Sequence, residues 1–308
     1  MELTFAQYSV TQQMKNITAE ILPNSQIEKI QLTDSVFQFK RLEKKYLLNS
    51  FQAELLIGQV GFYIPLDKKS TENPFISSIY FDNAEWKCFN AQIEKQNPRF
   101  KLRLRQYGEN ENDVRRRFLE IKRKNNSISY KERLNIHLPD SKSATDFLLD
   151  YVRTSNMKIK VDSINDVYHK IRNVIQDNRL EPVVQVSYKR IAFENQDRTL
   201  RITFDTGLNF QSFPALFNRS VFTNHEMPDD FFIMEIKYKG KIPVWLKRLL
   251  KLNNIQRQRF SKYCKAIKSI YDLETNSDIT INSVGHSGTY KYGHIKSIIN
   301  DTVRVQLA

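Results

Sequence analysis

The chain has 308 residues, of which 40% are hydrophobic and 12% aromatic, so it can bury a core and is not disordered as a whole. Its 48 Lys and Arg residues outnumber its 34 Asp and Glu residues, and the formal net charge of +14 favours an anionic partner such as a phosphate compound, a nucleic acid or an acidic membrane surface. The two cysteines, Cys88 and Cys264, have neither metal-ligand spacing nor a disulfide framework, which is typical of a reducing cytosol.

The first part of the chain predicts strands joined by short helices. Residues 1–34 have modest amphipathic character and are expected to form a helical lead-in. Asn49 and Ser50 precede the apolar-sided stretch 51–60, where a capped helix is expected. A short helix or turn is expected at 85–91. Strands are expected at 36–48, 75–82, 100–107, 115–124 and 129–137.

The second part mixes helices with three further strands. Helices are expected at 143–153, 164–176, 243–252 and 259–273, and strands at 183–193, 199–206 and 231–239. Residues 274–308 are rich in Ser, Asn, Thr and Gly and are expected to form a polar tail. About eight strands are enough to close a barrel that holds one small ligand. We therefore expect an α+β domain at 35–273, an eight-stranded antiparallel β-barrel with flanking helices.

Five strand-like stretches carry charged residues at alternating positions. They are 41–45, 101–105, 120–124, 201–205 and 235–239. Since residues i, i+2 and i+4 of a strand share a face, each stretch has charges on one face and mostly apolar residues on the other. Repetition over five strands predicts a barrel with a charged interior, and this interior is the candidate active site.

The composition of the charged rows favours phosphate chemistry. Arg and Lys bind phosphate oxygens, and a polyanion would relieve the repulsion among many cations in one interior. A few carboxylates among them are suited to hold Mn²⁺ or Mg²⁺, which phosphate oxygens would complete. These carboxylates are Glu43, Glu120, Asp205 and Glu235. Cations together with a metal are the ingredients of phosphoryl transfer.

The same rows have simpler explanations. A basic row on a single strand is more commonly a solvated sheet face, and two such strands with Tyr107 and Phe118 nearby would suit a nucleic-acid-binding ribbon. The sequence contains no Walker-type glycine loop, dinucleotide fingerprint or nucleophile elbow, so phosphate binding would depend on side chains.

The charged motifs occur in an order that resembles the VTC (vacuolar transporter chaperone) domain, the polyphosphate polymerase branch of the triphosphate tunnel metalloenzymes. The motifs are Arg41-x-Glu43-x-Lys45-Tyr46, Lys101-Leu-Arg103-Leu-Arg105, Phe118-Leu-Glu120-Ile-Lys122, Lys131-x-Arg133, Ser187-Tyr188-x-Arg190, Arg201-Ile-Thr-Phe-Asp205, Glu235-Ile-Lys237 and Arg259-Phe260-Ser261-Lys262-Tyr263. The resemblance covers roughly residues 35–272.

This resemblance implies an antiparallel tunnel that binds ATP with Mn²⁺ or Mg²⁺, transfers the γ-phosphate to a growing polyphosphate chain and releases ADP. The catalytic cations that it implies are Lys45, Arg103, Arg105, Lys122, Lys131, Arg190 and Lys262. The implied substrate-binding residues are Arg133, Tyr188, Arg201, Lys237 and Ser261, although Arg133, Arg201 and Lys237 could instead form salt bridges to Glu43, Glu120 or Asp205. Glu235 would hold the metal, and Glu43, Glu120 and Asp205 are further metal candidates.

One departure from the superfamily pattern favours polymerisation over hydrolysis. Hydrolytic relatives often begin with Glu-x-Glu-x-Lys, whereas Arg41 occupies the first of these positions here. A site with fewer acidic ligands suits a phosphate nucleophile, which needs little general-base help. Two alternatives stay open: a tunnel triphosphatase acting on inorganic or nucleoside triphosphates, and a non-catalytic binder of polyanions or nucleic acids. The leading hypothesis expects no nucleic-acid partner.

The expected location follows from two absences in the sequence. The N-terminus has no signal-peptide pattern, and no apolar run approaches the roughly 20 residues that span a bilayer. We therefore expect a cytoplasmic protein. A position at the periphery of a membrane and a separate membrane protein partner are both compatible with the sequence.

Overall fold

The computed structural model describes residues 34–39, 42–126, 128–136, 165–213 and 224–271. The expected lead-in up to residue 33, the expected helix at 143–153 and the tail at 274–308 lie outside the described residues, as does Arg41.

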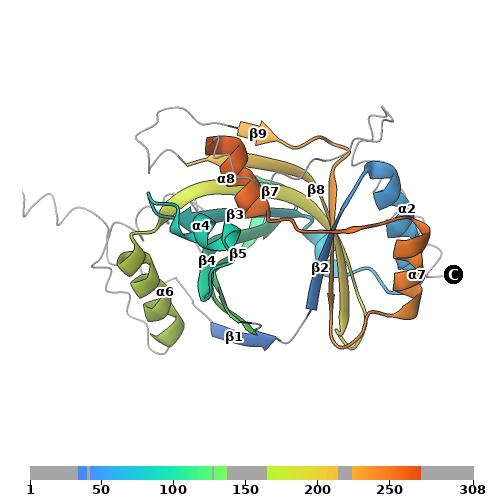
Figure 1. The fold of residues 1–308 in the computed structure, drawn as a ribbon, viewed down its shortest axis with the longest axis horizontal. Coiled ribbons are helices and arrows are strands. Elements are labelled where there is room, and N and C mark those ends of the chain that lie inside the picture. Colours follow the sequence, from blue (N-terminus) through green and yellow to red (C-terminus); the bar gives the residue numbers. More distant parts are fainter. Residues whose placement is uncertain (1–33, 40–41, 127, 137–164, 214–223, 272–308) are drawn as a thin grey trace, which may run out of the picture.

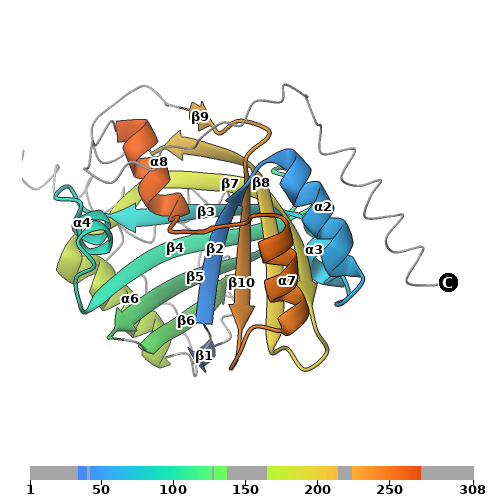
Figure 2. The same cartoon turned by 45° about the vertical axis from the view of Figure 1, so that its right-hand side comes forward.

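The described strands form one curved antiparallel sheet (Figures 1 and 2). The strands are β1 (Asp34–Phe39), β2 (Leu42–Leu48), β3 (Phe75–Asp82), β4 (Arg99–Gly108), β5 (Val114–Asn125), β6 (Ile128–Ile136), β7 (Glu181–Glu194), β8 (Leu200–Ser212), β9 (Asn224–Glu226), β10 (Phe232–Tyr238) and β11 (Arg257–Gln258). Their order is β1-β6-β5-β4-β3-β7-β8-β10-β2-β11, and β9 pairs with β8. The predicted antiparallel sheet with flanking helices is confirmed.

The sheet is curled, but its two ends are not paired with each other by backbone hydrogen bonds. Among the described strands, β6 ends the series of long strands beside β1, and β2 ends it beside β11. The strand expected at 36–48 is in fact two strands, because β1 pairs with β6 while β2 pairs with β10. The chain passes directly from β1 to β2, so the two ends of the sheet are joined by the backbone. The described sheet is therefore strongly curled but is not closed into a barrel by strand pairing, which corrects the expectation of a closed barrel.

The described helices are α2 (Ser50–Gly61), α3 (Lys68–Glu72), α4 (Lys87–Ile93), α6 (Asn165–Asn178), α7 (Val244–Leu252) and α8 (Lys262–Tyr271). Helices α2, α6 and α7 lie outside the curve of the sheet, whereas α8 lies against one end of its concave face, where Lys262 contacts Asp205 (Figures 1 and 2). One hydrophobic cluster packs α4, α6 and α8 against strands that include β3 to β7. A second cluster packs α2 and α7 against β2, β8 and β10. Burial of these apolar faces leaves the alternate side chains of the strands pointing to the concave face.

Side-chain caps fix where two helices begin. Asn49 accepts a hydrogen bond from the Gln52 amide at 2.8 Å, and the Gln52 side chain accepts one from the Asn49 amide at 3.2 Å, so the predicted cap of α2 is confirmed. Helix α8 begins at Lys262, three residues later than expected, because the Ser261 hydroxyl accepts the Cys264 amide at 3.3 Å. This start places Lys262 in the first turn.

Candidate active site

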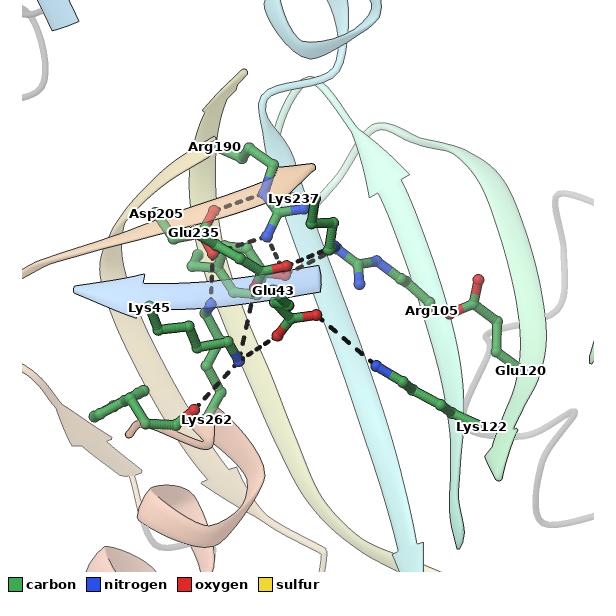
Figure 3. A network of polar contacts seen from close by, with 12 residues as sticks. Glu43, Lys45, Arg105, Glu120, Lys122, Arg190, Asp205, Glu235, Lys237 and Lys262 are labelled. Atoms are coloured by element: carbon green, nitrogen blue, oxygen red, sulfur yellow. Dashed lines mark hydrogen bonds and ion pairs between the residues drawn. The ribbon is translucent and has the colours of Figure 1, made fainter. Parts of the chain in front are cut away.

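Strand alternation gathers the charged rows on the concave face of the sheet. In β4, Leu102 and Leu104 are buried in the first hydrophobic cluster, so the residues between and beside them point the other way. The register then aligns Lys101 with Lys122 and Lys131 in one row, and Arg103 with Glu120 and Arg133 in the next. On the facing part of the sheet, Glu235 lies beside Lys45 and Lys237 beside Glu43. Side chains from both parts meet in Figure 3.

One contact shows how far the sheet curls. Lys122 on β5 reaches Glu43 on β2, with 3.9 Å between Nζ and Oε2, although these strands are not neighbours in the sheet (Figure 3). The pKa of Lys122 is lowered by burial and by the nearby Lys237 and Lys45, while Glu43 acts to raise it. Cations from different strands of the concave face therefore lie close enough to repel one another.

Asp205 is the most deeply buried carboxylate of the site. The Arg190 guanidinium donates to both of its oxygens, at 2.6 and 2.8 Å, and the Lys262 ammonium contacts it at 2.5 Å. Burial acts to raise the pKa of Asp205, but Arg190 and Lys262 outweigh it and bring the value to about 2. Asp205 is thus ionised at neutral pH and joins β7 and β8 to the start of α8.

Glu43 and Glu235 form a second carboxylate group around Lys45. The Lys45 ammonium lies 3.4 Å from Glu43 and 3.6 Å from Glu235, and Lys237 contacts Glu235 at 2.5 Å. Burial and the charge of Glu235 act to raise the pKa of Glu43, but Lys45 and Lys237 lower it overall. Burial acts similarly on Glu235, whose pKa Lys237 and Lys45 hold well below its usual value.

Glu120 forms a separate group on the opposite part of the sheet. Arg103 donates to it from two nitrogens, at 3.0 and 2.8 Å, and Lys131 contacts it at 2.5 Å. The carboxylate is only 2% exposed, and although burial acts to raise its pKa, Arg103 and Lys131 lower it strongly. Arg103 and Lys131 are therefore largely engaged in neutralising Glu120.

Two cations of the concave face have no carboxylate partner among the described residues. Arg105 is buried, donates to the Tyr188 hydroxyl at 2.8 Å and lies 5.1 Å from the Tyr107 ring centroid, while its Nε has no hydrogen-bond partner in the described structure. Lys101 donates to the Ser261 hydroxyl at 3.2 Å. The pKa of Lys101 is lowered by burial and also by Lys45 and Lys122. Both positive charges are available for an anionic ligand.

Lys101 was absent from the residues predicted for the site. The sequence pattern could have identified it, because Lys101 stands two residues before Arg103 in the same alternating row.

Arg201, unlike the other predicted cations, contacts carboxylates outside the predicted site. Its guanidinium contacts Asp67 at 2.8 Å and Glu194 at 3.2 Å. Arg133 packs over Phe118, with 4.7 Å from its guanidinium carbon to the ring centroid.

The segment before α8 is tied to three strands. Lys45 of β2 donates to the Phe260 carbonyl at 3.2 Å, Lys101 of β4 contacts Ser261, and Lys262 contacts Asp205 of β8. The Tyr263 hydroxyl donates to buried Asp82, which also accepts two backbone amides at the start of α4. These contacts hold Lys262 and Ser261 against one side of the charged face.

The predicted metal ligands do not form a single group. Among the described residues, no cluster of three or more His, Cys, Asp or Glu side chains has a geometry that could hold a metal. Glu43 and Glu235 come together around Lys45, whereas Glu120 and Asp205 are each held by two cations elsewhere. Two neighbouring carboxylates still fit Mg²⁺ or Mn²⁺, because such ions commonly bind one or two carboxylates together with substrate phosphates and waters.

Acidification is expected to destabilise the fold through Asp205. Because its folded pKa is about 2, below the unfolded value, its pairing contributes stability at neutral pH that is lost as pH falls from about 4 to about 2. The contribution is roughly 2–3 kcal/mol. Urea unfolding at a series of pH values should show this fall, and Asp205→Asn should flatten it. The same slope in the variant and the parent would contradict the assignment.

The sequence matches a known domain over most of its length. The match is to the VTC domain and covers residues 40–271, nearly the span of the charged motifs. One curated protein, vacuolar transporter chaperone complex subunit 4 of Trypanosoma cruzi (strain CL Brener), is 25% identical over 226 residues. That alignment takes in 64% of this chain but only 28% of the relative, so the chain spans less than a third of the relative's length.

Two solved structures show a partial likeness to this chain. A candidate adenylate cyclase from Bacillus halodurans has a TM-score of 0.40 and 12% identity, covering 73% of this chain and 95% of that protein. A second candidate adenylate cyclase, from Vibrio parahaemolyticus, has a TM-score of 0.34 and 13% identity, covering 76% of this chain and 98% of that protein.

In the part of the chain that the structure describes, every helix is too short or too polar to cross a membrane.

Proposed function

Since this chain belongs to the VTC domain family, as its motifs predicted, we propose that it is a metal-dependent polyphosphate polymerase. It would transfer the γ-phosphate of ATP to a growing chain of inorganic polyphosphate and release ADP. The observation that carries the proposal is the surplus of cations on the concave face, above all Arg105 and Lys101, which have no carboxylate partner among the described residues. A polyphosphate chain would supply the missing negative charge along its whole length.

The proposed reaction exchanges one phosphoanhydride bond for another. A terminal phosphate oxygen of the acceptor chain attacks the γ-phosphorus of ATP, and the bond from that phosphorus to the β–γ bridging oxygen breaks. The bridging oxygen leaves with ADP. The nucleophile is already an anion, so no side chain is required to remove a proton from it. Catalysis then depends mainly on position and charge.

Each group of side chains would have a distinct part in this reaction. Arg105, Lys101 and Lys122 would bind phosphate oxygens from β4 and β5, and Lys262 with Ser261 would bind them from the α8 side. Glu43 and Glu235 would hold a Mn²⁺ or Mg²⁺ ion, whose chemistry is to withdraw charge from the phosphate oxygens of the nucleotide. Arg190, Arg103 and Lys131 would keep their buried carboxylates ionised and would bind phosphate from the same positions. We also propose Arg133, Tyr188 and Lys237 as substrate contacts.

The named relative also bears on partners. The Trypanosoma cruzi protein is a subunit of a vacuolar transporter chaperone complex. We propose that this chain likewise works with a protein partner. A membrane protein that receives the polyphosphate product would suit this role.

The function is tested by the products formed from ATP. With ATP and Mn²⁺ we expect long chains on a gel that disappear on treatment with exopolyphosphatase, and one ADP released for each phosphate incorporated. Glu235→Gln should abolish the polymer while binding of tripolyphosphate survives, because the cations remain. Orthophosphate release without polymer would favour a tunnel triphosphatase instead. A Glu235→Gln variant that turns over ATP as fast as the parent would exclude Glu235 from the reaction. Absence of any ATP turnover by the parent chain would favour a polyanion binder.

A further inference from the structure

Helices α2 and α7 expose large apolar side chains on the outside of the molecule. Eight large hydrophobic side chains are exposed in the described part of the chain, and six of them lie on α2, on the two residues after it or on α7. These six are Phe51, Leu55, Phe62, Tyr63, Val244 and Leu252, and the exposed fraction reaches 73% at Phe62 and 81% at Leu252. Apolar side chains gathered in this way, rather than scattered singly, mark a surface that interacts with something.

Two apolar residues of α2 and Phe62, the residue that caps its C-terminus, form a stripe along one face. Phe51, Leu55 and Phe62 are spaced by four and seven residues, which places them on the same side of a helix. The opposite side already packs in the core through Leu56 and Val60, both of which are buried. The stripe is therefore surplus to what the fold itself needs.

Direct contacts join α2 and α7 into one surface. The rings of Tyr63 and Trp245 stack with centroids 4.2 Å apart, and the Asn253 side chain donates to the Gln59 side chain at 3.2 Å. Figures 1 and 2 both show the two helices next to each other at the end of the molecule away from α4 and α6. We call this surface the α2–α7 face.

The charge of the α2–α7 face is almost wholly positive. The segment 239–252 contains five basic residues and no acidic one, and all five are exposed. They are Lys239, Lys241, Lys247, Arg248 and Lys251. On α2 the single charged residue is Glu54. The face thus combines exposed aromatic and aliphatic side chains with lysine and arginine.

We propose that the α2–α7 face docks on an anionic lipid bilayer. Helices that lie in a membrane interface bury an apolar side at the boundary between headgroups and acyl chains, and they place Lys and Arg among the anionic headgroups. The long basic side chains can keep their charged ends in water while their stems cover apolar surface. A second copy of this chain fits less well, because the basic segments of the two copies would repel each other.

The proposal is tested by co-sedimentation of the full chain with lipid vesicles. We expect binding to phosphatidylcholine vesicles that contain about 30% phosphatidylserine, weakening as salt is added, and little binding to phosphatidylcholine alone. The triple variant K247E/R248E/K251E should bind the anionic vesicles at least about a hundredfold more weakly. Replacing both Phe51 and Phe62 by Ser should also weaken binding, and should do so most at high salt, where the apolar contribution dominates.

The matched control reverses three exposed charges at the other end of the molecule. K87E/K95E/R179E makes the same change in net charge near α4 and α6, and it should keep most of the binding. Equal losses in the two triple variants would overturn the proposal in favour of non-specific attraction. Absence of vesicle binding by the parent chain would overturn it as well. So would a dimer in light scattering that Phe51→Ser with Phe62→Ser converts to a monomer without affecting vesicle binding.

Discussion

Replacing Arg190 by alanine is expected to lower the free energy of unfolding by about 3–5 kcal/mol. Asp205 is completely buried and takes two hydrogen bonds from Arg190, so the variant leaves a buried carboxylate with Lys262 as its remaining cationic contact among the described residues. The loss exceeds the worth of the pair itself, because most of it is the cost of a buried carboxylate that loses one of its two counter-charges and two hydrogen bonds. Urea unfolding of the purified chain at neutral pH measures it.

The matched control for Arg190 is an arginine with the same chemistry at the surface. Arg115 contacts Glu109 at 2.9 Å and Asp113 at 2.6 Å, but its side chain is 48% exposed. Arg115→Ala should therefore change the free energy of unfolding very little, because solvent screens an exposed ion pair. In a double-mutant cycle, adding Asp205→Asn to Arg190→Ala should recover part of the loss, since the orphaned charge is removed. Equal losses at positions 115 and 190, or additive losses in the cycle, would contradict this account of the site.

Replacing Arg105 by alanine should have the opposite profile, with little change in stability and a large loss of function. The guanidinium is buried and forms no salt bridge among the described residues, so its removal breaks no ion pair, although it takes away a charge that helps to lower the pKa of Glu120. Turnover of ATP should fall by a factor on the order of 10²–10³, as expected when one preorganised donor to a charged transition state is lost. Calorimetric titration with tripolyphosphate should show weaker binding independently of turnover.

Arg201 provides the comparison for Arg105. Its charge is already matched by Asp67 and Glu194, so Arg201→Ala should lower stability modestly and leave tripolyphosphate affinity close to that of the parent. Arg105→Lys should retain part of the function, because it keeps the charge but loses the fork that binds two phosphate oxygens. If Arg201→Ala weakened tripolyphosphate binding as much as Arg105→Ala, the distinction between paired and unpaired cations would be wrong.

Alternation in the sequence was sufficient to predict which residues share the concave face. The period of two identifies Arg103 and Arg105 as neighbours on one face without any knowledge of the fold, and the apolar residues between them identify the buried side. The cap of α2 was equally readable, because Asn49 and Gln52 are close in sequence and satisfy each other. Features determined by local chemistry were therefore predicted well.

The alternating pattern could not predict which segments far apart in the sequence pair with each other. The row containing Arg201 looks like the others, and only the fold shows that Asp67 lies close enough to neutralise it. The stretch 36–48 reads as one strand, because nothing local reveals that its two halves pair with opposite ends of the sheet. The gathering of Glu43 and Glu235 without Glu120 and Asp205 also depends on how strongly the sheet curls, which is a property of the assembled domain.

The contact between Glu43, Lys45 and Glu235 joins the first long strand of the domain to one of the last. β2 and β10 pair directly although about 190 residues separate them, so their ladder closes a very long loop. During synthesis, the ribosome must release nearly the whole domain before this ladder can form, and until then β2 has no partner strand. The proposed metal-binding carboxylates therefore come together only after most of the domain has been made, so a partly made chain lacks the pair.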